Sequence, residues 1–184
     1  MTGRVEKLKR EFQIRVQWLA FPLHPETPPE GRSLKDLFAG RNIDLPQMLS
    51  HLSQEAQRLA LPFGDRQKTY NSRRAQELAK WAEQMGKGDV FHDAVFRAYF
   101  AQGHNIFNMD TLAKIADSVG LDQAATRDVI DCGSFKAAVD RDWERAYQSG
   151  IRAVPTFIIG GQSVVGAQPY HVLKKMVRHI SDNA

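Results

Sequence analysis

The chain has 184 residues, of which 42% are hydrophobic, and a formal net charge of +4. A chain of this length buries roughly 70% of its unfolded surface, which suffices for one domain with an appended helical layer. We expect a cytoplasmic protein with no membrane or nucleic-acid partner. No run of the sequence approaches the about 18 apolar residues of a membrane span, and the net charge is too modest to imply a nucleic-acid partner. Met1 to Phe12 is charged and unlike a secretory signal, and a single cysteine suits a reducing compartment.

The N-terminal part predicts a helix followed by a strand. Val5 to Phe12 forms a charged helical pattern, and apolar residues then alternate with Arg15 and Gln17 from Ile14 to Ala20. Alternation of this kind is typical of a strand with one buried face. The proline-rich passage from Pro22 to Gly31 interrupts it and predicts an irregular crossing into the next part of the chain.

From this crossing to about Asp142, every periodic segment is helical. Five helices are expected, opened by Pro46, Asn71, Asp89, Asn108 and Ser134, and a short helical pattern starts near Asp122. The residues expected to face inward are Met48, Leu49, Leu52, Ala56 and Leu59; Ala75, Leu78, Ala79, Ala82 and Met85; Phe91, Val95, Ala98 and Tyr99; Leu112, Ile115 and Ala116; and Phe135, Ala138, Val139, Trp143 and Ala146.

The C-terminal part combines signals in an uncommon order. Gly150 ends a helix, and Pro155 leads the strand Thr156 to Ile159 because a proline fits a ladder only at its start. Gly160-Gly161 then predicts a hairpin into Ser163-Val164-Val165. Pro169 begins a final helix whose apolar positions are Val172, Leu173, Met176, Val177 and Ile180.

This order resembles the second half of a thioredoxin-like domain. Over essentially its whole length, the chain resembles the DsbA-like family of thioredoxin-fold oxidoreductases, in the FrnE-type branch with a large helical insertion. The motifs that carry the resemblance are Ala153 to Phe157 (AVPTF), Val165 to Pro169 (VGAQP), Trp18 to Pro25 (WLAFPLHP), Pro28 to Gly31 (PPEG), Asn71 to Ala75 (NSRRA) and Ala98 to Gly103 (AYFAQG).

The resemblance implies an α/β, thioredoxin-like fold with a large all-helical insertion, in which the N-terminal strand is missing. The thioredoxin-like domain is expected to comprise residues 1–30 and 145–184, and the insertion residues 31–144. Relatives begin with a strand that runs into Cys-x-x-Cys, whereas this sequence starts at Met1-Thr2-Gly3-Arg4 and enters the first helix directly. No catalytic residue is therefore assigned.

The resemblance also implies a binding site around a cis Val154-Pro155 bond. In that arrangement the Val154 backbone faces outward and can pair with an extended peptide. We expect Val154, Pro155, Thr156, Phe21 and His24 to bind substrate, in a groove between the Phe21 to His24 loop and the insertion. The implied ligand is a peptide or protein thiol, or a small thiol such as glutathione, and no cofactor is expected.

The single cysteine, Cys132, is a poor candidate for thiol chemistry. It lies inside the insertion beside Asp131, which disfavours the thiolate, and one thiol cannot form the intramolecular disulfide that completes dithiol exchange. The six histidines lack the short spacings of a metal site, and no metal is expected; they are His24, His51, His92, His104, His171 and His179.

Three functions remain open at this point. The first is a thiol-disulfide oxidoreductase whose start is truncated or assigned to the wrong codon. The second is a glutathione-dependent isomerase or transferase of the 2-hydroxychromene-2-carboxylate isomerase and kappa type. The third is a non-catalytic module that binds peptides. Because the missing strand would lie between Ile14–Ala20 and the Pro155-led strand, we expect direct pairing of these two strands or a homodimer that fills the gap, with weak stability in either case.

Overall fold

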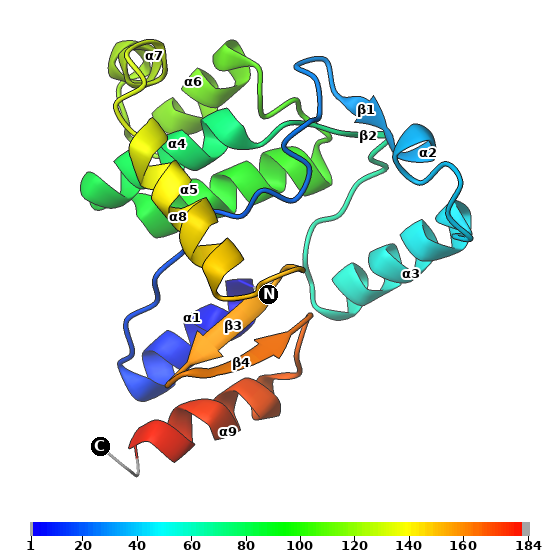
Figure 1. Cartoon of the computed structure of the whole chain (residues 1–184), viewed down its shortest axis with the longest axis vertical. Helices are drawn as coiled ribbons and strands as arrows, with labels where there is room; N and C mark the ends of the chain where they lie inside the picture. The colour runs from blue at the N-terminus through cyan, green and yellow to red at the C-terminus, as the bar shows by residue number, and fades with distance from the viewer. Residues whose placement is uncertain (1, 182–184) are drawn as a thin grey trace. The chain divides into compact units, whose positions relative to one another are not determined.

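The computed structural model describes residues 2–181 and divides the chain into two compact units. Unit 1 consists of Met1–Leu23 and Asp140–Ala184, and unit 2 is the intervening His24–Val139. The chain crosses from unit 2 back to unit 1 within helix α8 (Lys136–Gln148; Figure 1). The sequence places these borders near residues 30 and 145 instead.

Unit 1 is built from two helices and a hairpin besides its part of α8. The elements are α1 (Thr2–Phe12), β3 (Thr156–Ile159), β4 (Gln162–Val165) and α9 (Tyr170–Ser181). Leu8 of α1 and Leu173 and Val177 of α9 form its buried cluster, against which Phe157, Ile159 and Val164 of the hairpin pack together with Phe12, Ile14 and Tyr170. One face of the hairpin therefore rests on the two helices.

The hairpin has the form that the sequence predicts. β3 and β4 are antiparallel, with Ile159 opposite Gln162 and Thr156 opposite Val165. Gly160 and Gly161 make the two-residue turn with φ values of 56° and 77°, which glycine adopts without steric cost. The predicted helix end at Gly150, with φ 68°, is also confirmed.

The strand predicted at Ile14–Ala20 is not part of a sheet. Its side chains do alternate: Ile14, Val16 and Trp18 are half-buried, whereas Arg15 and Gln17 are exposed. Among the described residues, however, β3 pairs only with β4, and residues 13–20 join no ladder. The expected direct pairing with β3 is therefore wrong. Alternation records which side chains are buried, but a strand also needs a backbone partner within one strand spacing, about 4.8 Å.

Unit 2 is mostly helical (Figure 1). Its elements are β1 (Arg32–Ser33), α2 (Leu34–Leu37), α3 (Leu45–Arg58), β2 (Lys68–Thr69), α4 (Arg73–Gln84), α5 (Gly88–Phe96), the π-helix η1 (Arg97–Ala101), α6 (Met109–Ser118), α7 (Gln123–Asp131) and the start of α8. β1 and β2 form a two-residue antiparallel ladder. The expectation of an all-helical insertion is therefore wrong in this detail.

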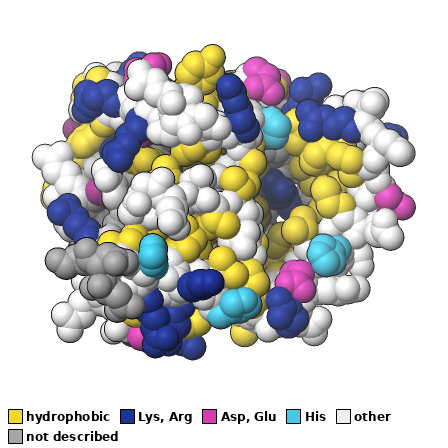
Figure 2. All heavy atoms as spheres, turned by 60° about the horizontal axis from the view of Figure 1, so that its bottom comes forward, with side chains coloured by type: hydrophobic (Ala, Val, Ile, Leu, Met, Phe, Trp, Pro, Cys, Tyr) yellow, Lys and Arg dark blue, Asp and Glu magenta, His cyan; other side chains and the backbone are white. Residues whose placement is uncertain are grey.

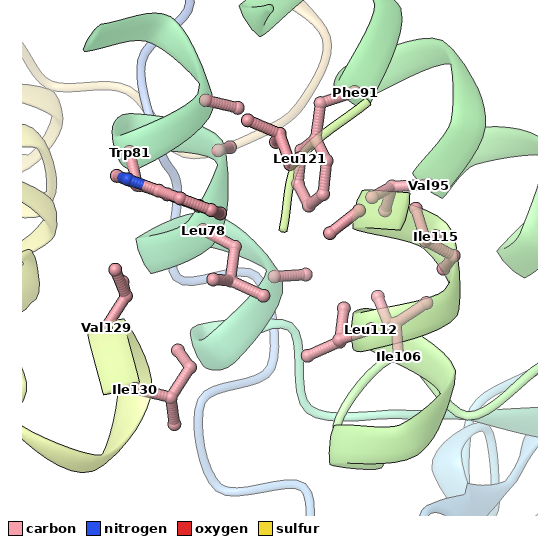
Figure 3. Close-up of a cluster of buried hydrophobic side chains, with 14 of the residues drawn as sticks. Leu78, Trp81, Phe91, Val95, Ile106, Leu112, Ile115, Leu121, Val129 and Ile130 are labelled. Atoms are coloured by element: carbon pink, nitrogen blue, oxygen red, sulfur yellow. The ribbon is translucent and has the colours of Figure 1, made fainter. Parts of the chain in front are cut away.

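The core of unit 2 lies between α4, α5, α6 and α7. Leu78 and Phe91 are fully buried, and Leu112 and Ile130 approach them from α6 and α7 (Figure 3). Asn108 and Asp122 cap α6 and α7 by accepting hydrogen bonds from the Thr111 and Ala125 N–H groups. The core positions predicted on α6 are all buried, as expected for apolar residues that recur at helical spacing.

Several inward positions and helix starts are corrected by the structure. No residue of α3 is buried, and Leu52 is exposed, because α3 lies away from the core of unit 2. Met85 is exposed because it follows the last residue of α4. Helix α5 begins at Gly88, so Asp89 lies in its first turn and is not its cap.

The last predicted cap is also displaced. Helix α8 begins at Lys136, two residues beyond the predicted cap Ser134, whose hydroxyl contacts the Cys132 thiol instead. Gly133, with φ 65°, separates this turn from the preceding helix.

Candidate functional site: the Val154–Pro155 loop and the outer edge of β3

The loop before β3 is closed by local hydrogen bonds. After Gly150, the Thr156 hydroxyl donates to the Ala153 carbonyl at 2.6 Å, and the Gly166 N–H donates to the Pro155 carbonyl at 2.8 Å. The Val154–Pro155 peptide bond is cis. Pro155 thus extends the β3–β4 ladder by one hydrogen bond, and Val154 stands just beyond its end.

The register of the hairpin determines which backbone groups of β3 face outward. In a two-residue hairpin the residues that flank the turn form a hydrogen-bonded pair, and such pairs alternate along the ladder. Ile159 and Phe157 therefore bond to β4, which agrees with the Gly166–Pro155 bond two residues further along. The N–H and C=O groups of Thr156 and Ile158 point away from β4. None of these four groups has a hydrogen-bond partner among the described residues.

Two apolar side chains are exposed along this edge. Val154 is 44% and Ile158 is 48% exposed, although both are large and hydrophobic. Ile158 lies on the face of β3 opposite to Phe157 and Ile159, which pack on the helices of unit 1. An open edge with exposed apolar residues is the feature of a sheet that attracts another extended chain.

A buried carboxylate fixes the segment that leads to Phe21. Asp142 of α8 is 9% exposed, and its Oδ2 accepts a hydrogen bond of 2.9 Å from the Ala20 N–H. Phe21 is half-buried and belongs to unit 1, as do Val154, Pro155 and Thr156. The sequence reasoning did not single out Asp142, since an Asp on a helix carries no signal that its partner is a backbone amide 122 residues away.

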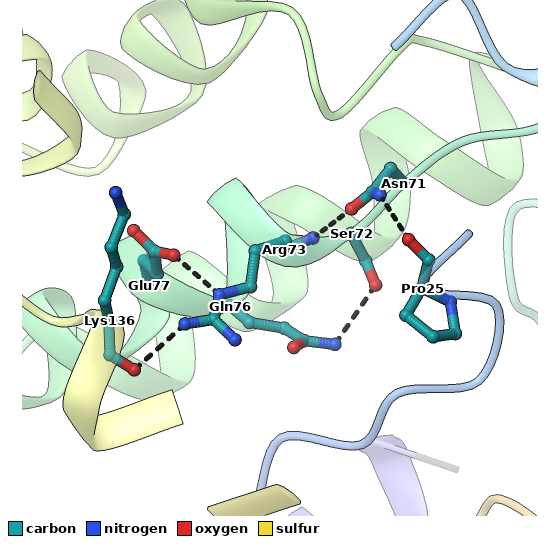
Figure 4. Close-up of polar contacts among 7 residues, drawn as sticks. All are labelled: Pro25, Asn71, Ser72, Arg73, Gln76, Glu77 and Lys136. Carbon is teal, nitrogen blue, oxygen red and sulfur yellow. Dashed lines mark hydrogen bonds and ion pairs between the residues drawn. The ribbon is translucent and has the colours of Figure 1, made fainter. Parts of the chain in front are cut away.

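His24, the fifth predicted site residue, belongs to unit 2. It is half-buried, and its Nδ1 lies 3.7 Å from Glu26 Oε1. The proline-rich passage that follows is fastened to α4 by Asn71, whose Nδ2 donates to the Pro25 carbonyl at 2.9 Å (Figure 4). The same Nδ2 donates to the Thr27 carbonyl at 3.0 Å. Asn71 Oδ1 also accepts from the Arg73 N–H at the start of α4.

Arg73 extends this polar network. Its Nε donates to Glu77 Oε1 at 2.6 Å, and its guanidinium donates to the Lys136 carbonyl at 3.0 Å (Figure 4). Glu77 is buried, so the ion pair with Arg73 offsets the cost of burying the Glu77 carboxylate inside unit 2. The Asn71 to Ala75 motif therefore has a structural role within unit 2.

Cys132 is exposed in unit 2, and its thiol contacts the Ser134 hydroxyl. Among the described residues, no group of three or more His, Cys, Asp or Glu side chains is arranged to hold a metal ion. No helix within residues 2–181 is long and apolar enough to cross a bilayer.

Helices α1 and α9 are joined by one charged cluster at the surface of unit 1. Glu11 accepts hydrogen bonds from Lys174 and Tyr170. The bonds from Lys174 and then Tyr170 lower the pKa of Glu11, whereas burial and the bond to Glu11 raise the pKa of the Tyr170 hydroxyl. Lys7 lies over the Tyr170 ring, 4.4 Å from its centre. The cluster fastens together the helices that carry the hairpin.

A proline-led hairpin on two helices, with a helical unit inserted in the chain before it, defines a thioredoxin-like domain with an insertion. The chain belongs to the family described as the DSBA-like thioredoxin domain, whose profile matches residues 1–178.

Three comparisons place the chain among known proteins. It is 28% identical over 180 residues to the uncharacterized protein YwbO of Bacillus subtilis (strain 168), covering 89% of this chain and 81% of that one. It is similar to the crystal structure of a probable DsbA oxidoreductase, SCO1869 from Streptomyces coelicolor, with a TM-score of 0.89, 24% identity and coverage of 99% and 83%. A 2-hydroxychromene-2-carboxylate isomerase is similar with a TM-score of 0.74, 18% identity and coverage of 100% and 91%. At these identities, the two structural likenesses show the fold.

Proposed function

We propose that this chain binds an extended polypeptide along the outer edge of β3, with the Val154–Pro155 loop at one end of the site. One observation carries the proposal: the backbone groups of Thr156 and Ile158 point outward and have no partner among the described residues. A strand that adds to this edge would satisfy all four groups. It would also cover the exposed side chains of Val154 and Ile158.

The proposal does not include dithiol exchange by the chain's own cysteine. Exchange needs an attacking thiolate and a second thiol that resolves the mixed disulfide, and the sequence contains one cysteine. The family nevertheless supports a polypeptide ligand, because oxidoreductases of the DsbA-like family act on protein thiols. Assignment to the FrnE-type branch and a cytoplasmic location remain predictions and form part of this proposal.

The expected affinity is modest. Four backbone hydrogen bonds at about 0.5–1.5 kcal/mol each contribute about 2–6 kcal/mol. Burial of the two exposed apolar side chains adds to this, and a dissociation constant between about 1 μM and 1 mM follows. Binding should therefore be measured by fluorescence anisotropy at high protein concentration, with fluorescein-labelled, reduced and carboxymethylated α-lactalbumin as a permanently unfolded polypeptide.

The register provides a matched pair of variants. Ile158 and Ser163 face each other across the ladder, and each points its N–H away from the partner strand. Ile158→Pro removes a donor from the outer edge of β3, and Ser163→Pro removes the equivalent donor from β4, while both leave the ladder bonds in place. We expect Ile158→Pro to weaken binding about two- to tenfold through the lost hydrogen bond, and Ser163→Pro to leave binding unchanged.

A second pair of variants tests the same proposal without proline, in case the proline variants do not fold. Val154→Glu should weaken binding, whereas Val90→Glu, at a residue of unit 2 that is 52% exposed, should not. Equal affinities within each pair, in variants with the wild-type circular dichroism spectrum, would refute the proposal.

A further inference from the structure

Arg66, in the linker between α3 and β2, is a half-buried cation with few hydrogen bonds. Its Nη1 donates to the Tyr99 hydroxyl, and its Nε is enclosed by protein atoms and has no hydrogen-bond partner among the described residues. A guanidinium carries N–H donors on all of its nitrogens and keeps its charge at any ordinary pH. Within residues 2–181, Nη1 is thus the only nitrogen of this guanidinium that is hydrogen-bonded.

The Arg66 guanidinium also lacks a counter-ion among the described residues. The acidic residue beside it, Asp65, accepts a hydrogen bond of 2.8 Å from Gln67 Nε2 instead. A charge that is taken out of water without an opposite charge is costly. The other half-buried arginines of unit 2 each donate to a carboxylate or a backbone carbonyl: Arg73 to Glu77, Arg74 to Phe107 and Arg127 to Asp110.

A cation beside apolar side chains is not unusual on this chain. On the face drawn in Figure 2, hydrophobic side chains reach the surface between Lys and Arg side chains. Arg66 is distinguished by its depth, because its Nε is enclosed. Water and salt screen a partly buried charge much less than an exposed one, so an anion bound here would be held more strongly.

Aromatic rings form the surroundings of this cation. The centre of the Arg66 guanidinium lies 4.6 Å from the centre of the Tyr99 ring and 5.4 Å from that of the Phe100 ring. Phe100 is 37% exposed, and the half-buried Phe63 stacks on it at 6.5 Å with an angle of 19° between the rings. Tyr99 and Phe100 belong to the π-helix η1, an element that is rare and occurs frequently at functional sites.

The linker is fixed on η1, so the cation and the rings are held in one arrangement. The Gly64 N–H donates to the Phe100 carbonyl at 2.9 Å, and a Cβ at Gly64 would collide with the Ala101 carbonyl oxygen. The Tyr99 hydroxyl lies 2.9 Å from the buried Thr69 hydroxyl. A site that is ordered before it binds does not lose affinity to the cost of ordering.

We propose that Arg66, Phe100 and Phe63 bind a small monocarboxylate with an apolar tail. The carboxylate accepts hydrogen bonds from the Arg66 guanidinium, whose planar fork matches the two oxygens of a carboxylate. The tail covers the exposed part of the Phe100 ring and the Phe63 ring beside it. All three residues belong to unit 2, so the inference does not depend on the proposed function in unit 1.

The test is an NMR titration of the full chain with octanoate. We expect saturable shifts of the Arg66 Nε–H signal and of the amides of residues 63–67 and 97–101. Acetate keeps the charge without the tail, and octan-1-ol keeps the tail without the charge, so each should bind at least about tenfold more weakly. Affinity for acetate or octan-1-ol equal to that for octanoate would overturn the inference, and so would saturable shifts confined to other parts of the chain.

Variants identify the residue that holds the carboxylate. Arg66→Met removes the guanidinium, keeps a long apolar side chain, and should weaken octanoate binding at least about tenfold. Arg66→Lys keeps the charge without the fork and should restore only part of the affinity. The matched control is Arg58→Met, because Arg58 is an exposed arginine of unit 2 that is paired with Glu55, and it should leave the affinity within about twofold.

A further variant covers the case in which Arg66→Met disturbs η1. Phe100→Ser changes an exposed ring and leaves Arg66 in place, and it should weaken binding of octanoate but leave that of acetate unchanged. Octanoate binding as tight as that of the wild type in Arg66→Met, or in Phe100→Ser, would overturn the inference.

Discussion

The small core of unit 1 makes it the more easily unfolded part of the chain. Its buried cluster, among the described residues, is Leu8, Leu173 and Val177, whereas the cluster of unit 2 contains fifteen buried residues. Complete burial of such a side chain contributes about 1.5–3 kcal/mol, so the three together contribute roughly 5–9 kcal/mol before the entropy of ordering is subtracted. Leu173 is fully buried at the centre of this cluster.

We therefore predict that Leu173→Ala unfolds unit 1. A Leu→Ala change in a core costs about 2–5 kcal/mol, which is a large part of what the cluster supplies. The matched control is Leu112→Ala, because Leu112 is also fully buried but lies in unit 2. It should lower the stability of unit 2 by a similar amount and leave it folded, since many neighbours remain.

The assay is hydrogen exchange with mass spectrometry, read separately over α1, the hairpin and α9 and over α4 to α7. Leu173→Ala should abolish protection in the first set and preserve it in the second. A uniform loss of protection over both sets would refute the reasoning that each unit has its own core. A wild-type monomer that unfolds in one cooperative step above about 65 °C, beyond the usual mesophile range, would contradict the expected weakness of unit 1.

Three further predictions concern single residues. The chain should not reduce insulin, because one thiol cannot complete a cycle of dithiol exchange. The Cys132→Ser variant should give the same result as the wild type in an insulin-reduction assay. Insulin reduction by the wild type that disappears in Cys132→Ser would contradict the prediction. Asn71→Ala removes two hydrogen bonds to carbonyls of the proline-rich passage and should destabilise unit 2 by about 1–3 kcal/mol, with faster proteolysis of that passage; unchanged proteolysis would count against it. The folded-state pKa of Glu11 lies below its usual value of 4.5, so its contribution to stability is present above that value and is lost as pH falls through the folded pKa. The free energies of unfolding of wild type and Glu11→Gln, measured by urea denaturation, should therefore converge at acid pH and differ near neutral pH. A difference between the two free energies that stays constant with pH would refute the linkage.

Local signals in the sequence determined most of the secondary structure. The glycine pair of the hairpin, the end of α8 at Gly150, the cap Asn108 and the start of α7 near Asp122 are where they were predicted. Each of these depends on conformational preferences or hydrogen bonds within a few residues, and these act in the same way in any fold. The helical periodicity of α6 likewise identified its buried face.

Tertiary structure decided which of these elements have partners. The alternation of Ile14–Ala20 is compatible with a strand, but only the arrangement of unit 1 leaves that segment unpaired and the edge of β3 open. The apolar stripe of α3 is real, yet none of its residues is buried. The bond between Asp142 and the Ala20 amide joins residues that are remote in the chain. Burial and pairing depend on what lies across space from a residue, and local sequence does not contain that information.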